Sequence, residues 1–530
     1  MRKLWVILLS LGLIVAFAMP AAAVDVKFSG QYYAFGAYVD NPSLLDKGEQ
    51  PAPVSANAGG FANAGAWGPD GTNGTTRDSR SMRGPYAWYA QRLRTNIEFQ
   101  VVEGLKLVTR FDALEKHWGD QSWAGGTGET QSRTQTPAGV GGATAKAQEN
   151  LEWERAYLDF NVPFGKFQIG YMQFLMWGTD FLNTPLSAGG IRYFYSQGPW
   201  MAVAAVEKRA EYVGLNKANI GIANDADKDV YDLGVTYKLK NGEVGLLYQY
   251  NRNSASKWQE RNGYLTQLMG VFPYTKLTFG KFFIEAEGVY GWGDLRSYES
   301  TAATASVGQP TGGVNINAPA QNVSVSALGA FVHAKYDWKP AYFGAQFVYL
   351  SGDDMSDSDK VSGSIASALQ ANYGFNRALI LWNSDYGDNL GQMYGNIAPA
   401  SARNPRTGSF TTSYVFMDNV WFYQLYAGFK PTPKMDFKVA ISMANADKKP
   451  KSDVGATGTL GWYTGAAVRE FTSSKYGTEL DLTGSYKIYD NLTYMVGFGY
   501  LWTGDYFKGY DSNATVKDNY LLTHRITLNF

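Results

Sequence analysis

Polar residues, most of them charged, recur at nearly every second position in two neighbouring segments of the chain, 91–101 and 105–112. Successive side chains of a β-strand point to opposite faces, so each segment would carry its charges on one face and apolar side chains on the other. Opposed basic and acidic groups along a narrow aqueous passage create a transverse field that sorts solutes by charge. The residues that we predict to carry this selectivity, two of them from the segment 150–162, are Arg92, Arg94, Glu98, Arg110, Asp112, Arg155 and Asp159.

The same charges could instead pair with one another and have only a structural role. The polar positions are even-numbered in both segments. If these positions share one face of the sheet, the numbers of two residues that lie opposite each other add up to an even number. The loop between the two strands must then contain an odd number of residues. Residues 102–104 provide a three-residue loop, with a glycine at its left-handed bulge position. This register predicts that Arg94 lies opposite Asp112 and that Asn96 lies opposite Arg110.

Period-two alternation continues along the chain, and the alternating segments are joined in turn by tight turns and long polar connections. We count about 18 strands, within a range of roughly 16 to 20. Short turns at one end and long loops at the other are typical of transmembrane barrels. We therefore predict an all-β fold, a single antiparallel transmembrane β-barrel over residues 24–530, with short periplasmic turns and long extracellular loops such as 352–412. The alternative, a soluble β-helix or sandwich, would have to bury these charges in a dry core.

The two ends of the chain agree with a barrel that is secreted through the inner membrane. Arg2 and Lys3 precede an apolar run over 4–19 and then an alanine triplet, so we predict a signal peptide at 1–23. An uncleaved anchor is the alternative, but the run is short for a membrane span. In the last segment, Ile526, Leu528 and Phe530 share one apolar face, and this ending resembles the assembly signal of Gram-negative outer-membrane barrels.

Composition excludes several classes of function. The chain has no Cys, which rules out disulfides, thiolate metal sites and covalent attachment of c-type haem. Its 47 basic and 47 acidic residues balance, so no basic field favours nucleic acid. The mean hydropathy of −0.27 is too polar for a bundle of membrane helices, whereas a barrel with alternating faces tolerates it. Three scattered His residues and the lack of hydrolase or phosphate-loop motifs lead us to expect no enzyme activity, no metal and no cofactor.

Four segments carry a resemblance to a known family: 26–41 (VKFSGQYYAFGAYVDN), 153–174 (WERAYLDFNVPFGKFQIGYMQF), 347–359 (FVYLSGDDMSDSD) and 524–530 (HRITLNF). With these segments the chain resembles proteobacterial outer-membrane porins of the alginate-export-like group, in the style seen in deltaproteobacteria. The resemblance covers most of the chain as architecture and implies an 18-stranded barrel. Alginate exporters have a strongly arginine-rich lumen, from which the balanced charge of this chain departs.

The connection at 175–190 is the third long one, and resemblance to general porins implies that it folds inward and narrows the channel. Gly189 and Gly190 would then permit the return bend. An ordinary surface loop is the alternative. The residues that would line the constriction are Trp177, Asp180, Phe181 and Asn183.

The leading functional hypothesis is a porin that lets small hydrophilic solutes or ions diffuse across the outer membrane. The alternatives are a barrel that sheathes a multihaem cytochrome from another chain, which needs a wide lumen, and a polysaccharide exporter of the alginate type. The expected partners are outer-membrane lipid and lipopolysaccharide, the barrel-assembly machinery, a second copy of the chain, and a periplasmic or multihaem cytochrome, but no nucleic acid.

Overall fold

The structure is a computed structural model, and it describes residues 24–41, 44, 85–118, 151–181, 183, 186–211, 227–254, 264–298, 322–353, 359–363, 375–383, 419–449, 451–453, 468–508, 512–513 and 515–530. The predicted signal peptide and most of the loop at 352–412 lie outside these residues. Among the described residues, no helix is long and apolar enough to cross a membrane.

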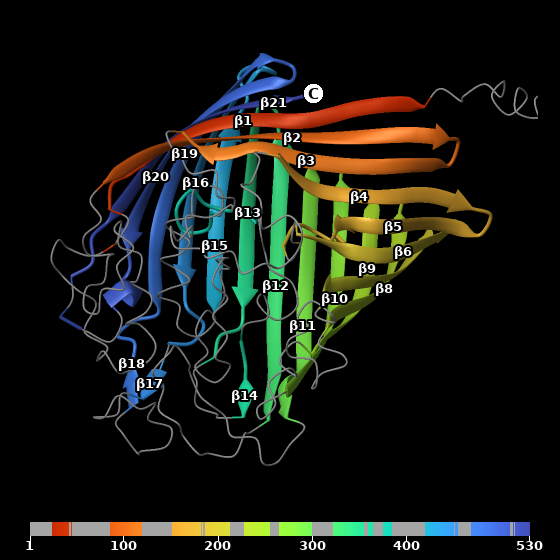
Figure 1. Cartoon of the computed structure of the whole chain (residues 1–530). Coiled ribbons are helices and arrows are strands. Elements are labelled where there is room, and N and C mark those ends of the chain that lie inside the picture. Colours follow the sequence, from red (N-terminus) through yellow and green to blue (C-terminus); the bar gives the residue numbers. More distant parts are fainter. Residues whose placement is uncertain are drawn as a thin grey trace, which may run out of the picture.

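Eighteen antiparallel strands form one closed barrel, as predicted. Each pairs with the next in chain order, and the last pairs with the first through a register that runs from Gln31 opposite Asn529 to Val39 opposite Leu521. Figure 1 shows the first strand, in red, beside the last, in blue. The strands are β1 (Asp25–Val39), β2 (Tyr86–Val102), β3 (Leu105–His117), β4 (Leu151–Val162), β5 (Gly165–Gln173), β6 (Ser187–Gln197), β7 (Trp200–Ala210), β8 (Lys228–Leu239), β9 (Gly242–Asn253), β10 (Tyr264–Phe279), β11 (Phe282–Tyr298), β12 (Val323–Trp338), β13 (Ala341–Leu350), β15 (Val420–Phe429), β16 (Met435–Asn445), β19 (Lys475–Tyr489), β20 (Leu492–Thr503) and β21 (Asn519–Asn529).

Short elements decorate the end of the barrel from which the long connections leave. The strand β14 (Lys360–Val361) pairs in parallel with β12, and β17 (Lys451–Asp453) pairs with β18 (Val468–Glu470). The 3₁₀ helix η5 (Asp505–Lys508), which follows β20, was not predicted.

The two faces of the barrel differ sharply in polarity. Leu233 and Leu425 on the outer face are 62% and 63% exposed, whereas their inward-facing neighbours Asp232 and Gln424 are only 4% and 2% exposed. An apolar surface that runs around the whole barrel is stable against lipid rather than against water, and a closed sheet leaves no unpaired edge in the lipid. Exposed rings that lie next to the short turns, where an interfacial girdle is expected, are Phe164, Trp200, Phe279, Trp338 and Tyr489.

The turn between β2 and β3 has the predicted register but a different construction. It comprises residues 103–104 rather than 102–104, and β2 has a bulge at Val101 that supplies the additional residue. The bulge keeps the even-numbered side chains of both strands on one face. Gly104 has a φ of 80°, the left-handed conformation that this turn requires.

Candidate pore constriction

Three arginines surround one carboxylate on the inner face of β2 and β3. Arg94 donates from Nε and Nη2 to the two oxygens of Asp112 at 2.7 and 2.6 Å, and Arg92 and Arg110 approach the same carboxylate to 3.9 and 3.8 Å. The Asp112 side chain is only 3% exposed, while those of Arg92 and Arg94 are 20% and 23% exposed. The predicted pairing of Arg94 with Asp112 is therefore present, and the cations face the lumen more openly than their shared anion. The other predicted pair, Asn96 with Arg110, is also in register.

This arginine wall continues onto the neighbouring strands. Arg110 lies 3.4 Å from Glu154, beside a bulge in β4, and Arg155 donates to the side chain of Gln173. On the other side, the Arg525 guanidinium lies 4.1 Å from the centre of the Tyr33 ring. We use the name arginine wall for Arg92, Arg94, Arg110, Arg155 and Arg525.

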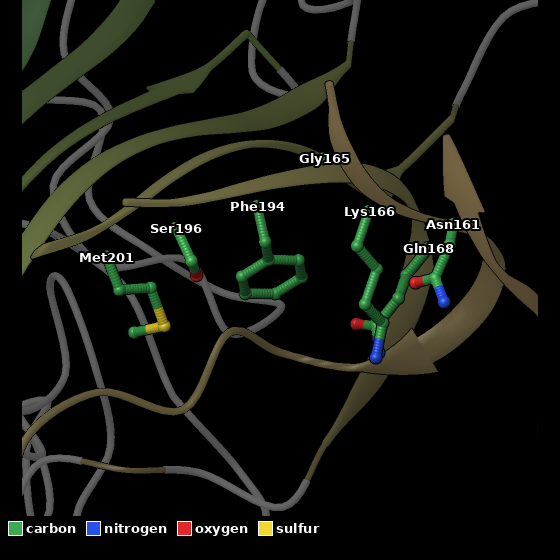
Figure 2. Close-up of a pocket in the computed structure, with 7 residues that line it drawn as sticks. All are labelled: Asn161, Gly165, Lys166, Gln168, Phe194, Ser196 and Met201. Atoms are coloured by element: carbon green, nitrogen blue, oxygen red, sulfur yellow. The ribbon is translucent and has the colours of Figure 1, made fainter. Parts of the chain in front are cut away.

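Two of the predicted selectivity residues, Glu98 and Asp159, lie nearer to the short turns than the arginine wall does. Glu98 pairs with Lys106 at 2.9 Å, and Asp159 pairs with Lys166 at 2.7 Å and accepts a hydrogen bond from Gln168. A cleft of about 380 Å³ adjoins the pair of Asp159 and Lys166. Figure 2 shows Phe194 in this cleft between Met201 on one side and Lys166 on the other. The cleft is lined by Asn161, Gly165, Lys166, Gln168, Phe194, Ser196 and Met201.

The connection after β5 folds into the barrel. We call residues 174–186 the first inner segment, of which 182, 184 and 185 are not among the described residues. Glu287 on β11 accepts hydrogen bonds from the backbone N–H and the hydroxyl of Thr179 at 2.7 and 2.5 Å, and Glu207 on β7 accepts one from the N–H of Leu175 at 2.6 Å. These carboxylates satisfy buried N–H groups that no regular element pairs.

The four predicted constriction residues all belong to this segment. Trp177 and Phe181 are 7% and 0% exposed; the indole N–H donates to the backbone carbonyl of Phe272, and the ring covers Gly234, where a Cβ atom would come within 2.7 Å of it. Asn183 is buried and holds the segment together through hydrogen bonds to both backbone groups of Trp177. The remaining residue, Asp180, has a side chain that is 60% exposed.

Two features of the predicted loop need correction. It ends at 186 rather than 190, and Gly189 and Gly190 are strand residues of β6 instead of a return bend. They pair with Tyr171 and Gly170 of β5, and at Gly190 a Cβ atom would come within 2.8 Å of the carbonyl oxygen of Val206. Gly190 therefore serves close strand packing, whereas a Cβ atom at Gly189 would meet no atom within 4 Å.

A second inner segment, residues 375–383, was not predicted. Its backbone turns on itself through a hydrogen bond from the Arg377 N–H to the Trp382 carbonyl. Glu479 on β19 accepts hydrogen bonds from the N–H groups of Ile380 and Leu381 at 2.7 and 2.6 Å, an arrangement in which successive N–H groups enclose an anion. The sequence signal was the apolar run 378–382 inside a polar loop.

The two inner segments meet inside the barrel. Asp180 and Arg377 form an ion pair at 2.6 Å, and the rings of Phe181 and Phe375 lie 5.3 Å apart in an edge-on contact. The contacts described above hold the segments against strands between β7 and β19, and the arginine wall occupies β21 and β2–β4. Among the described residues, no group of three or more His, Asp or Glu side chains could hold a metal ion.

No family model and no curated protein matches this chain. Similar folds occur in the solved structures of OccK8 (OprE) and OccK2 (OpdF) of Pseudomonas aeruginosa, with 12% and 10% identity and TM-scores of 0.41 and 0.42, and of DcaP, an outer membrane channel of Acinetobacter baumannii, with 12% identity and a TM-score of 0.38. Each match covers 96% of this chain and 98% of the other. These distant likenesses concern the fold alone, and the narrower resemblance to the alginate-export-like group stays a prediction.

Proposed function

We propose that this chain is an outer-membrane channel through which small hydrophilic solutes or ions diffuse down their gradients. The observation that carries the proposal is a closed barrel, apolar outside and polar inside, whose lumen contains two inner segments opposite a wall of arginines. The water path would run between the arginine wall and the inner segments. In this narrow passage the field of the guanidinium groups would set the preference for anions or cations.

The inner segments and the paired charges of the lumen favour a channel over the other two hypotheses. A barrel that sheathes a cytochrome needs an open lumen, whereas Phe181 and Phe375 are packed together inside this one. A polyuronate exporter needs a strongly basic lumen, whereas each described arginine of β2 and β3 lies near a carboxylate. Copurification of a haem protein with the barrel would support the sheath instead.

The test is a recording of the purified protein in planar lipid bilayers with a salt gradient. We expect discrete single-channel steps and a reversal potential different from zero. Solutes of graded size should then reduce the conductance only when they are small enough to enter the pore, and the largest solute that does so gives the size cut-off. The proposal would be contradicted by a protein that shows the heat-modifiable electrophoretic mobility of a folded barrel and inserts into the bilayer, but passes no ions.

We further propose that the terminal strand acts as the assembly signal. Phe530 exchanges backbone hydrogen bonds with Gly30 at 2.7 and 3.1 Å. The residue is 48% exposed and lies on the outer face, in line with Leu528 and Ile526. Replacing Phe530 with Ser should reduce the folded barrel in the outer membrane severalfold, while Phe530→Trp, which keeps the aromatic ring, should not. Immunoblots of unheated membranes measure this, and equal amounts of folded Phe530→Ser and wild-type barrel would disprove it.

A further inference from the structure

We propose that Asp180 and Arg377 are positioning residues that couple the two inner segments into one unit, so that this ion pair sets the aperture of the channel. The inference rests on the proposed function. The two residues come from connections that are far apart in the chain, after β5 and after β14, and each segment is anchored to its own part of the wall. The ion pair joins these separately anchored parts.

The surroundings of Arg377 hold its guanidinium in place for this contact. The group lies 3.7 Å from the centre of the Phe375 ring and donates from Nη1 to Gln346 of β13 at 3.3 Å, while Nη2 lies 2.6 Å from Asp180. The Arg377 side chain is only 12% exposed. Because the arginine is already oriented, little conformational entropy is lost when the carboxylate approaches.

The contact has two layers that must separate together. Beneath the ion pair, Phe375 packs edge-on against both Phe181 and Phe331, at ring distances of 5.3 and 5.1 Å. Moving the segments apart would bring these rings into water and would leave Arg377 partly buried without its carboxylate, so joined and separated arrangements should be distinct states. Asp180 lies at the water-exposed edge of the contact, where a change of charge meets little steric resistance.

Single-channel recordings of four proteins test the coupling: wild type, Asp180→Arg, Arg377→Asp, and the double variant with the charges exchanged. Each single variant should flicker between conductance levels and admit larger neutral polymers. The population of the separated state should rise roughly fivefold, the factor that corresponds to about 1 kcal/mol for a partly exposed pair. The double variant restores the ion pair but not the contacts of the guanidinium with Phe375 and Gln346, so its conductance and cut-off should lie closer to those of the wild type than either single variant does. The matched control is Glu470→Gln, which removes the exposed pair with Lys449 at 2.8 Å and should change neither property.

The outcomes separate this inference from the proposed function. A folded wild type that passes no ions removes the channel itself. A conducting wild type whose single variants behave as it does overturns the coupling. A double variant whose defect equals the sum of the two single defects also overturns it, because the two residues would then act independently. If the reversed variants do not fold, Asp180→Asn changes only a side chain that is 60% exposed and gives the same decision through its conductance levels.

Discussion

Replacement of Arg92, Arg94 and Arg110 together by glutamate is expected to shift the reversal potential of the channel toward cation selectivity. The change converts three positive charges into negative ones along one wall of the passage, and the field of a charged wall acts strongly where the water path is narrow. In a tenfold salt gradient the limit for a fully selective pore is ~59 mV, and we expect a shift of tens of millivolts within that limit.

The three arginines share Asp112, which is almost completely buried, so the reversed variant also removes the partners of that carboxylate. The glutamine series at the same positions keeps donors near Asp112 and should give a shift of about half the size, since it removes charge without reversing it. Lys449→Glu, four residues beyond the end of β16 and paired with Glu470 rather than with the arginine wall, is the control that should leave the reversal potential unchanged. An unchanged potential in the reversed variant, with folded protein, would remove these residues from the selectivity mechanism.

The barrel could be predicted from the sequence because every strand of a membrane barrel contacts lipid on one face and water on the other. Lipid on one side and water on the other force apolar and polar residues to alternate, and this pattern alone determines strand number, closure and the faces of Arg94 and Asp112. The first residues of β2 were missed because 86–90 do not alternate cleanly in polarity. Strand ends are set by pairing with the neighbouring strand, here Val39 of β1 opposite Tyr86, and no local pattern records that.

The inner segments could not be predicted from the alternation of polar and apolar residues. Trp177 and Phe181 were recognised as candidates for a constriction only through resemblance to general porins, since a loop has no periodicity to read. The second segment was missed because its anchor, Glu479, lies about 100 residues further along the chain. Glu479 looks like any other lumen-facing charge of an alternating strand, and only the folded chain reveals that it binds the backbone of Ile380 and Leu381.

Replacement of Glu479 by leucine is expected to enlarge the channel. The carboxylate accepts two backbone N–H groups, its side chain is fully buried, and leucine cannot replace either hydrogen bond. An unsatisfied buried donor costs roughly 1–3 kcal/mol. The loss of two such bonds should therefore detach residues 375–383 from β19, so that water can hydrate the two N–H groups. The detached segment would no longer support Phe181 through Phe375, and the passage would widen.

Single-channel conductance and the swelling rates of liposomes in sugars of graded size measure this effect. Both should rise in Glu479→Leu and rise less in Glu479→Gln, which keeps one acceptor oxygen. The control is Asp436→Asn, because Asp436 on β16 also faces the lumen and contacts Tyr342 and Lys430. A folded Glu479→Leu protein with unchanged conductance and cut-off would mean that other contacts hold the second inner segment, such as the hydrogen bond from Leu379 N–H to Asp481 and the packing of Trp382 on Phe422. The Glu479 carboxylate would then be dispensable for the aperture.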